Sequence, residues 1–549
     1  MPFIAQEKTT CDVLIIGSGG AGLRAAIAAA SCGADVLMVS KARIGHTTNT
    51  YLSKAIIASS GWGDDNDNSG VHRRDTLQGG RYLNNPDMVA RFAEAIRKET
   101  MLLKEWGVQF GTKENGRPEI VKIPGHSYAR HLHGKNWKGR DLVLPLKQKA
   151  IESGVRFQEK IFITSLIVPD SKICGVTGIL DDGKFLVIQA KTVLLATGGF
   201  GHIFLNTNNA PGITGDGQAL AYKAGVALQD MEFVQFYPTA LGKRGSRILL
   251  YERLLEQDGV VLRNYLDEDI LVKNGYHTSV DITRDQLAKL IMKEIMEGPN
   301  SKGTIVMDME GLSPDMANSL SMLIPPQWFK GTKRFQVTPT THFCMGGVIV
   351  DNHGETSCSG LFAAGEVTAG AHGANRLGGN ALAEVIAMGG LVGKAAVDKA
   401  MTLDSIPGFD DAVQKERVLI ETMFKDNGEH PKKAIQKLKE TMWFNAGIVR
   451  DQTSLDKAIK TLLHLKDIQT SVLTSRDLIQ CLEFRNMLVV AEMICRSALE
   501  RTESRGAHFR KDFPKENKKD WLKNIRIHKV ASALKLEQVS VPNEDSVLF

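Results

Sequence analysis

The feature that most restricts the fold of this chain is a glycine-rich turn between two apolar stretches near its beginning. The segment CDVLIIGSGGAGLRAAIAAASCGADVLMVSK predicts a strand over Val13–Ile16, an alanine-rich helix, and a second strand over Val36–Val39. Gly17, Gly19 and Gly22 have the G-x-G-x-x-G spacing between the first strand and the helix. Because glycines there let a pyrophosphate approach the backbone, the segment predicts a β-α-β unit that binds a dinucleotide.

The unit departs from the dinucleotide fingerprint at the end of its second strand. An acidic residue that binds the ribose is expected there, and the chain has Ser40 and Lys41 instead. We still expect the nucleotide, with an altered ribose contact.

The rest of the chain predicts that a second lobe interrupts the nucleotide-binding domain. An apolar strand with a glycine stop, Thr192–Gly201, returns to the sheet, and TGDG opens another helix. Mixed strand and helix signals follow, and apolar residues after about residue 400 have helical spacing. We expect an α/β fold with these parts: a Rossmann-like domain in two segments (1–230 and 342–400), an α+β capping domain (231–341), a helical domain (401–515) and a C-terminal extension (516–549).

Composition argues against several classes of protein. The net charge of +6, from 68 basic and 62 acidic residues, gives no indication of nucleic-acid binding. The 7 cysteines are scattered without a C-x-x-C pair, so we expect neither a metal nor an iron–sulfur cluster in this chain. The start of the chain lacks the pattern of a signal peptide, and no run reaches the roughly 18 apolar residues that span a bilayer. We expect a cytoplasmic protein with no membrane span of its own.

The stretch HGANRLGGNALAEV (His372–Val385) combines two kinds of binding group. Arg376 lies between two glycine-containing turns, and the second turn leads directly into an apolar helix. Arginine has a planar fork of donors that suits carboxylates, whereas glycines at a helix start expose backbone N–H groups to a ligand. The stretch therefore predicts contacts with two ligands.

The order of motifs along the chain resembles the flavoprotein family of succinate dehydrogenase and fumarate reductase, which includes L-aspartate oxidase. The resemblance covers Asp12 to about Ile527, through GSGGAG, SK, ATGG, TGDG, DMEFVQ, THFCMGG, AAGE, HGANRLGGNALAE, TMW and ESRGAHFR. It implies that the dinucleotide is FAD and that the Rossmann-like domain is an FAD-binding domain. It also implies an oxidoreductase that acts on a small dicarboxylate.

The resemblance implies which residues contact FAD. The glycine turn would lie along the cofactor, Glu366 would approach the ribityl chain, and the backbone N–H groups of Ala381 and Leu382 would face the isoalloxazine edge. The complete implied set is Gly17, Gly19, Gly20, Gly22, Ser40, Lys41, Asn49, Thr50, Thr197, Gly198, Asp216, Glu366, Ala381 and Leu382.

Some family members tether FAD covalently to a histidine. Ala55 and Ile56 match a Gly-Gly pair of the family, and counting back from them places the tether position at Asn49, with His46 three residues earlier. We expect noncovalent FAD, with His46 as the rival tether. An untethered flavin has a lower reduction potential, which suits fumarate reduction better than succinate oxidation.

The resemblance also implies a dicarboxylate site. His342 and Arg376 match the carboxylate-binding pair, Arg284 matches the proton-donating arginine, and Glu252 would resupply its proton. Reducing fumarate needs a hydride at one alkene carbon and a proton at the other, so cations must oppose the charge that develops beside a carboxylate. Taken singly, each of these residues could instead be structural, because a lone histidine or arginine–aspartate pair usually is.

Two tyrosines depart from the family pattern at this site. Tyr237 replaces the family's histidine in His-Pro-Thr, and Tyr251 replaces the threonine in Thr-Glu. A phenol can donate a hydrogen bond but brings no charge. The arginine expected three positions after the glutamate is Leu255, with Arg253 nearby. These changes leave the substrate and the outer proton relay open.

Electrons would have to come from elsewhere, because this chain lacks cluster-binding cysteines. We expect an iron–sulfur partner subunit, and the helical region is either its docking surface or only a packing domain. The thiol-driven fumarate reductases of methanogens are close candidates among relatives with untethered flavin. The alternatives are an L-aspartate oxidase, a succinate-oxidising flavoenzyme, and a non-catalytic FAD-binding electron-transfer subunit.

Overall fold

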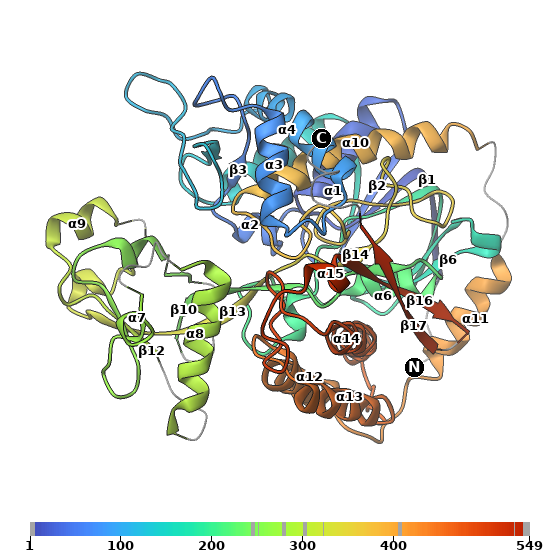
Figure 1. Ribbon diagram of the computed structural model, residues 1–549. Helices are drawn as coiled ribbons and strands as arrows, with labels where there is room; N and C mark the ends of the chain where they lie inside the picture. The colour runs from blue at the N-terminus through green and yellow to red at the C-terminus, as the bar shows by residue number, and fades with distance from the viewer. Residues whose placement is uncertain are drawn as a thin grey trace.

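The computed structural model describes residues 6–242, 248–250, 252–276, 282–299, 305–321, 323–403, 409–531 and 533–541, without the side chains of residues 252 and 253. An α/β body, an inserted lobe and a group of long helices are visible in Figure 1. The predicted fold class is confirmed.

A seven-stranded sheet forms the centre of the body. Its strands are β1 (Gln6–Ile16), β2 (Val36–Ser40), β5 (Arg156–Glu159), β6 (Ile161–Ile167), β7 (Gly175–Leu180), β8 (Phe185–Leu195) and β15 (Leu361–Ala363). They run in the order β5-β2-β1-β8-β7-β6, and β15 also pairs with β8. The pairs β1–β2, β1–β8, β2–β5 and β8–β15 are parallel, so the ends of several strands meet at one edge of the sheet.

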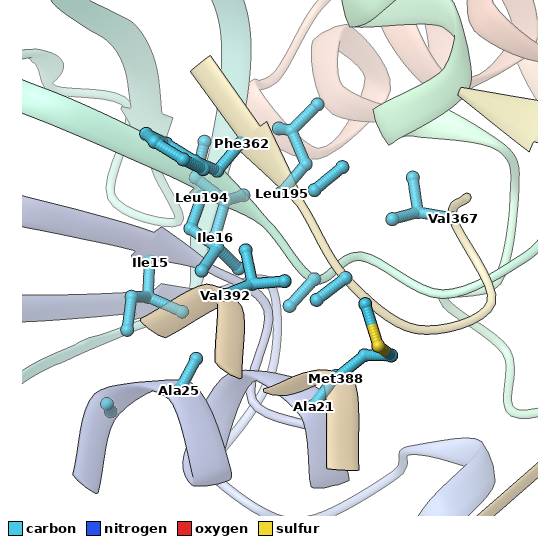
Figure 2. Close-up of a cluster of buried hydrophobic side chains, with 14 of the residues drawn as sticks. Ile15, Ile16, Ala21, Ala25, Leu194, Leu195, Phe362, Val367, Met388 and Val392 are labelled. Atoms are coloured by element: carbon cyan, nitrogen blue, oxygen red, sulfur yellow. The ribbon is translucent and has the colours of Figure 1, made fainter. Parts of the chain in front are cut away.

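Two helices, α1 (Gly20–Ser31) and α10 (Asn380–Ala400), pack against this sheet and against each other. A Cβ atom at Gly393 would lie 2.4 Å from the carbonyl oxygen of Ala25, so a larger residue would force the helices apart. Figure 2 shows side chains of both helices beneath strand residues such as Ile15 and Leu194. This close packing fixes the two helices relative to each other.

Helix α10 is long and apolar enough to cross a membrane, with a mean hydropathy of 1.3 over its best window. It is the single helix of that kind in the described part of the chain, and 78% of that window is buried inside the protein. This degree of burial is typical of a helix in the core of a protein.

The remaining elements of the body connect the sheet to its surroundings. They are α2 (Asn49–Leu52), β3 (Ile56–Ala58), α3 (Ser69–Gly79), α4 (Pro86–Glu105), β4 (His131–His133), α5 (Arg140–Glu152), α6 (Asp216–Lys223), β9 (Leu228–Gln229) and β14 (Gly347–Val348). Three short 3₁₀ turns, η1 (Pro169–Ser171), η2 (Gly201–Ile203) and η3 (Glu252–Glu256), lie in the first half of the chain.

The inserted lobe has its own sheet and its own core. Its elements are β10 (Val234–Leu241), β11 (Val261–Arg263), α7 (Ile270–Lys273), α8 (Arg284–Glu297), β12 (Ile305–Asp308), α9 (Pro314–Ser319), η6 (Trp328–Lys330) and β13 (Arg334–Cys344). The sheet runs β10-β13-β12-β11, and a cluster of buried apolar residues from Leu250 to Val337 fills the lobe. Strands β10 and β13 join it to the body (Figure 1). The separate core supports the proposal of a capping domain over 231–341, although β13 continues through the proposed boundary.

The helices after residue 400 share a second large core. They are α11 (Asp410–Glu421), α12 (Pro431–Ala446), α13 (Gln452–Lys466) and α14 (Ser475–Glu500). Ala288 and Met292 of α8 are buried in the same cluster as Leu438 of α12 and Leu462 of α13. The lobe therefore packs against the helical region as well as the body.

The last described residues form a hairpin that sequence patterns did not predict. It comprises α15 (Lys518–Trp521), β16 (Lys523–Val530) and β17 (Ala533–Ser540), and β16 pairs with β9 to complete a four-stranded sheet. Buried Asp230 accepts hydrogen bonds from Asn524 Nδ2 and from the backbone N–H of Ile525. The C-terminal extension is thus a structural part of the body.

Candidate active site

A cavity of about 430 Å³ lies at the end of the parallel strands, beside the glycine turn. Gly17 has a φ of +112°, and a Cβ atom there would lie 2.2 Å from the carbonyl oxygen of Ala196. Gly22 does not line the cavity, because it packs against Gly17: a Cβ atom at Gly22 would lie 2.0 Å from the carbonyl oxygen of Gly17. Gly17, Gly19 and Gly20 do line it, so these glycines leave room for a ligand at the start of α1.

A network of charged groups closes one end of this cavity. Lys41 Nζ lies 2.5 Å from Asp216 Oδ2 and 2.9 Å from Glu483 Oε1, and it donates to Thr214 Oγ1 over 3.0 Å. Burial opposes its charge, but Asp216 and Glu483 outweigh burial and raise the pKa of Lys41. Glu483 belongs to α14, so the helical region completes the site. Sequence reasoning missed Glu483, because nothing in the local sequence of α14 links this residue to the segments that bind the cofactor.

Glu366 lies at the other end of the first cavity. Its carboxylate accepts hydrogen bonds from Asn49 Nδ2 over 3.0 Å and from the backbone N–H of Cys344 over 3.1 Å. Burial raises the pKa of Glu366. Asn49 also donates to Asn209 Oδ1 over 2.7 Å, so its amide is fixed on both sides of the cavity wall. His46 lines the same cavity.

A second cavity of about 640 Å³ adjoins the first. Asn49, Thr50 and Glu366 line both cavities, so a ligand can extend from one into the other. Ala381 and Leu382 line the second cavity at the beginning of α10. Their backbone N–H groups belong to the first turn of that helix, where partial positive charge gathers.

The predicted proton donor and two of the predicted substrate-binding residues meet in the second cavity. Arg284, the first residue of α8, places its guanidinium carbon 5.2 Å from the centre of the Tyr237 ring. The Tyr237 ring in turn lies 5.6 Å from the His342 ring, at 66°. Tyr237 and His342 are on β10 and β13, which pair, so the sheet of the lobe fixes their distance.

Arg376 enters the same cavity from the loop before α10. Its Nη2 donates to Gln235 Oε1 over 2.8 Å, and its Nε has no hydrogen-bond partner among the described residues. Burial and the charge of Arg284 lower the pKa of Arg376 to about 9, so it remains protonated at neutral pH. Sequence reasoning missed Gln235, although it lies in the DMEFVQ motif.

His342 is neutral in this arrangement. Burial and the charges of Arg376 and Arg284 hold its pKa well below the usual value. Asn208 Nδ2 lies 3.0 Å and Asn208 Oδ1 lies 3.3 Å from Nδ1 of His342, so this amide can partner Nδ1 in either tautomer. When the amide donates to Nδ1, Nε2 carries the proton and can donate to a ligand.

Two predicted residues cannot be placed at this site. Tyr251 and the side chain of Glu252 lie outside the described residues. The backbone of Glu252 begins η3 in the inserted lobe.

Two family models match the chain. One is described as FAD binding domain and matches residues 12–382, and the other as fumarate reductase flavoprotein C-term and matches residues 435–545. The chain belongs to the flavoprotein family of fumarate reductase and succinate dehydrogenase. As a member of this family it binds FAD and is an oxidoreductase.

Relatives of this flavoprotein match it over nearly its whole length. A subunit of the fumarate reductase (CoM/CoB) of Methanothermobacter marburgensis is 34% identical over 95% of this chain and 98% of its own. L-aspartate oxidase of Saccharolobus solfataricus is 33% identical over 95% of this chain and 99% of its own. A solved structure of Escherichia coli quinol fumarate reductase FrdA, in a mutant form, has a TM-score of 0.87 and 28% identity, with 97% of each chain covered.

The residues of the first cavity fit FAD. The hydroxyl of Thr197 lines the cavity and is buried without a hydrogen-bond partner among the described residues. A cofactor along this wall would supply that partner, and the glycine turn leaves space for its pyrophosphate. Gly198 and Asp216 line the same wall, and Ser40 lies beside Lys41. Of the residues that the sequence assigned to FAD, Gly22 is the one that supports the cavity from behind.

Proposed function

We propose that this flavoprotein reduces fumarate to succinate. The observation that supports the proposal is the convergence of Arg284, His342 and Arg376 in one cavity that adjoins the FAD-binding cavity. Three donors around one space, two of them cationic, suit a dicarboxylate better than a neutral substrate.

Arg376 and His342 would hold one carboxylate of the substrate. Arg376 keeps its Nε free of partners in the described part of the chain, and His342 would donate from Nε2 when Asn208 donates to its Nδ1. Both groups would donate, and in the described part of the chain neither donates to a carboxylate of the protein. A substrate carboxylate would therefore satisfy Arg376 Nε, which is otherwise buried without a partner among the described residues.

Arg284 would donate the proton. Bound FAD would supply the hydride to one alkene carbon of fumarate, and the proton must reach the other carbon. Arg284 lies over the Tyr237 ring, which fixes the guanidinium on the side of the cavity formed by the lobe. Charge that develops beside the substrate carboxylate would be opposed by Arg284 and Arg376 together. Glu252 remains our proposed source of the next proton, and Tyr251 remains a proposed substrate contact.

Electrons would reach FAD from an iron–sulfur partner subunit in the cytoplasm. The relative from Methanothermobacter marburgensis is itself named a subunit, which supports a partner. Asn49 stands at the tether position and its amide is engaged by Glu366 and Asn209, which supports FAD bound without a covalent link.

An anaerobic experiment tests the proposal. The purified flavoprotein is reduced with dithionite, fumarate is added, and the visible flavin absorbance is followed while succinate is measured. We expect rapid reoxidation with one succinate formed per flavin. A protein that retains FAD and is not reoxidised would refute the proposal.

L-aspartate oxidation is the second candidate, because the relative from Saccharolobus solfataricus has that name and similar identity. A separate assay distinguishes the two activities: the oxidised flavoprotein is mixed with aspartate under anaerobic conditions, and the loss of visible flavin absorbance is followed, because aspartate would give electrons to FAD whereas fumarate would take them. A protein inactive in both assays would fit the third alternative, a non-catalytic electron-transfer subunit.

A further inference from the structure

A second group of cations lines the mouth of the second cavity. Lys54, Lys138 and Arg140 line it together with Arg284 and Arg376. Among the described residues that line this cavity, the sole acidic one is Glu366, and burial raises its pKa. Among the described residues of this lining, five basic side chains therefore stand against one carboxyl group.

The three cations are held in place by a tight backbone contact. Lys54 lies just before β3, and Lys138 and Arg140 flank Gly139 at the start of α5. The N–H of Gly139 donates to the carbonyl oxygen of Ser53 over 2.7 Å, and a Cβ atom at Gly139 would lie 1.8 Å from the carbonyl oxygen of Thr50. Since only glycine fits there, the two segments form one wall. Lys54 and Lys138 both line the cavity, and burial and the charge of Lys138 lower the pKa of Lys54.

Two of these cations, Lys138 and Arg140, have no acidic partner in the part of the chain that the structure describes. In the described part of the chain, neither Lys138 nor Arg140 has a carboxylate within 4.0 Å of its side-chain nitrogens. Asp141 is adjacent, but its carboxylate accepts from the backbone N–H of Asn136 over 2.8 Å and from Asn136 Nδ2 over 3.1 Å. Lys138 and Arg140 are exposed, so they face solvent at the mouth.

The inserted lobe lines the same cavity with apolar side chains and one cation. Ile248, Leu323, Ile324 and Pro325 are apolar, and Arg284 is cationic. An anion attracted by the exposed Lys138 and Arg140 is therefore still attracted, further inside the same cavity, by Arg284 and Arg376.

We propose that Lys54, Lys138 and Arg140 form an anion-capture subsite, which a dicarboxylate dianion occupies before it reaches Arg376 and His342. The proposal rests on the proposed function, since it assumes a dicarboxylate substrate. Clefts lined by charge of one sign raise association rates about 10- to 1000-fold, and salt suppresses the effect. The subsite therefore acts on the rate of capture and leaves the rate of release nearly unchanged.

The test measures association of an unreactive dicarboxylate, malonate, with the oxidised holoprotein. Stopped-flow tryptophan fluorescence is a suitable signal, because Trp137 lines the cavity, and flavin absorbance is a second one. The variant is K54Q/K138Q/R140Q. Its matched control, K432Q/K433Q/K457Q, removes three charges from exposed residues of α12 and α13. We expect the variant to lower the association rate constant about 10-fold at low ionic strength, with little difference from the control in 0.5 M salt.

Several outcomes would overturn the proposal. Equal association rates in the variant and the control would do so, as would a fall in affinity that comes entirely from faster release. If the triple variant loses FAD, the malonate association rate constant is measured instead for the single variant Arg140→Gln and, as a function of salt, for the native protein. A malonate association rate that does not change with salt in the native protein also refutes the subsite. Steered malonate binding without fumarate turnover would reject the proposed function and retain the subsite.

Discussion

Gln235 holds Arg376 at two points. Its Oε1 accepts from Arg376 Nη2 over 2.8 Å, and its Nε2 donates to the backbone carbonyl oxygen of Arg376 over 2.9 Å. The same Nε2 donates to Asn375 Oδ1 over 2.9 Å. Gln235 is buried on β10, so the sheet of the lobe orients an arginine that belongs to the body.

Replacing Gln235 by Leu should therefore weaken substrate binding more than catalysis. Hydrogen bonds to charged groups contribute about 1.5–3 kcal/mol, so KM for fumarate should rise roughly 10- to 100-fold while kcat falls less. Steady-state kinetics with FAD content measured in parallel would show the split. Gln235→Glu is the informative second variant, because its carboxylate would pair with Arg376 and compete with the substrate. A proportional loss of kcat with unchanged KM would contradict a positioning role.

Replacing Arg284 by Lys should leave FAD bound and reduce turnover by a factor of about 10² to 10⁴, the usual contribution of a positioned acid. The lysine keeps a charge but loses the planar contact with Tyr237. Single-turnover reoxidation of reduced flavin by fumarate measures the effect. Arg263→Lys, which alters an ion pair with Asp308 elsewhere in the lobe, serves as the control and should retain activity. Normal turnover in Arg284→Lys would remove Arg284 as the proton donor.

Three buried histidines support the loop before α10 and predict acid sensitivity. His72 Nε2 lies 2.8 Å from Asn380 Oδ1, and Nε2 of His126 and of His131 lies 2.9 Å and 3.1 Å from the carbonyl oxygen of Gly378. Burial lowers the pKa values of His72, His126 and His131 to about 3, about 2 and about 4.

Their pKa values are lower in the folded state than in the unfolded chain, where they are near 6.5. The unfolded state therefore binds more protons below pH 6.5. The contribution of these histidines to the free energy of unfolding is fully present above pH 6.5 and is lost progressively as the pH falls toward 4. Each histidine contributes about 1.4 kcal/mol per pH unit in that window. Urea denaturation at pH 7 and pH 5 measures the slope. His126→Gln keeps a donor and should reduce the slope by about one proton, whereas exposed His353→Gln should not. Equal slopes in both variants would contradict the assignment.

Replacing Glu483 by Gln should weaken FAD binding without any change at the substrate site. The ion pair with Lys41 holds the lysine at the wall of the first cavity, and its loss should raise the dissociation constant of FAD about 3- to 10-fold. Recovery of FAD fluorescence on dilution measures release directly. Glu500→Gln, at the other end of α14, is the matched control. If both variants release FAD at the native rate, Glu483 has no part in the cofactor site.

The sequence predicted those parts of the site that are coded by short local patterns. The glycine turn, the strands at Val13–Ile16 and Val36–Val39, and the helix start after Arg376 all depend on contiguous residues, and their positions are confirmed. The roles that we assigned to Arg284, His342 and Arg376 stay predictions, although the structure brings the three side chains into one cavity.

Contacts between distant segments could not be predicted in the same way. Gln235 and Arg376 are 141 residues apart, and nothing in either segment specifies the other. The wall of Lys54 and Lys138 depends on one glycine contact between two loops, and the hairpin of β16 and β17 depends on pairing with β9. Side-chain packing across the fold decides such contacts, and a single sequence does not display it.

The ion pair between Lys41 and Glu483 spans 442 positions of the chain. Synthesis proceeds from the N-terminal end, so the glycine turn and Lys41 leave the ribosome long before α14 exists. A nascent chain can fold its first strands early, yet it cannot close the Lys41 end of the cavity until most of the polypeptide has been translated. Completion of the cofactor site is consequently a late event in the maturation of this flavoprotein.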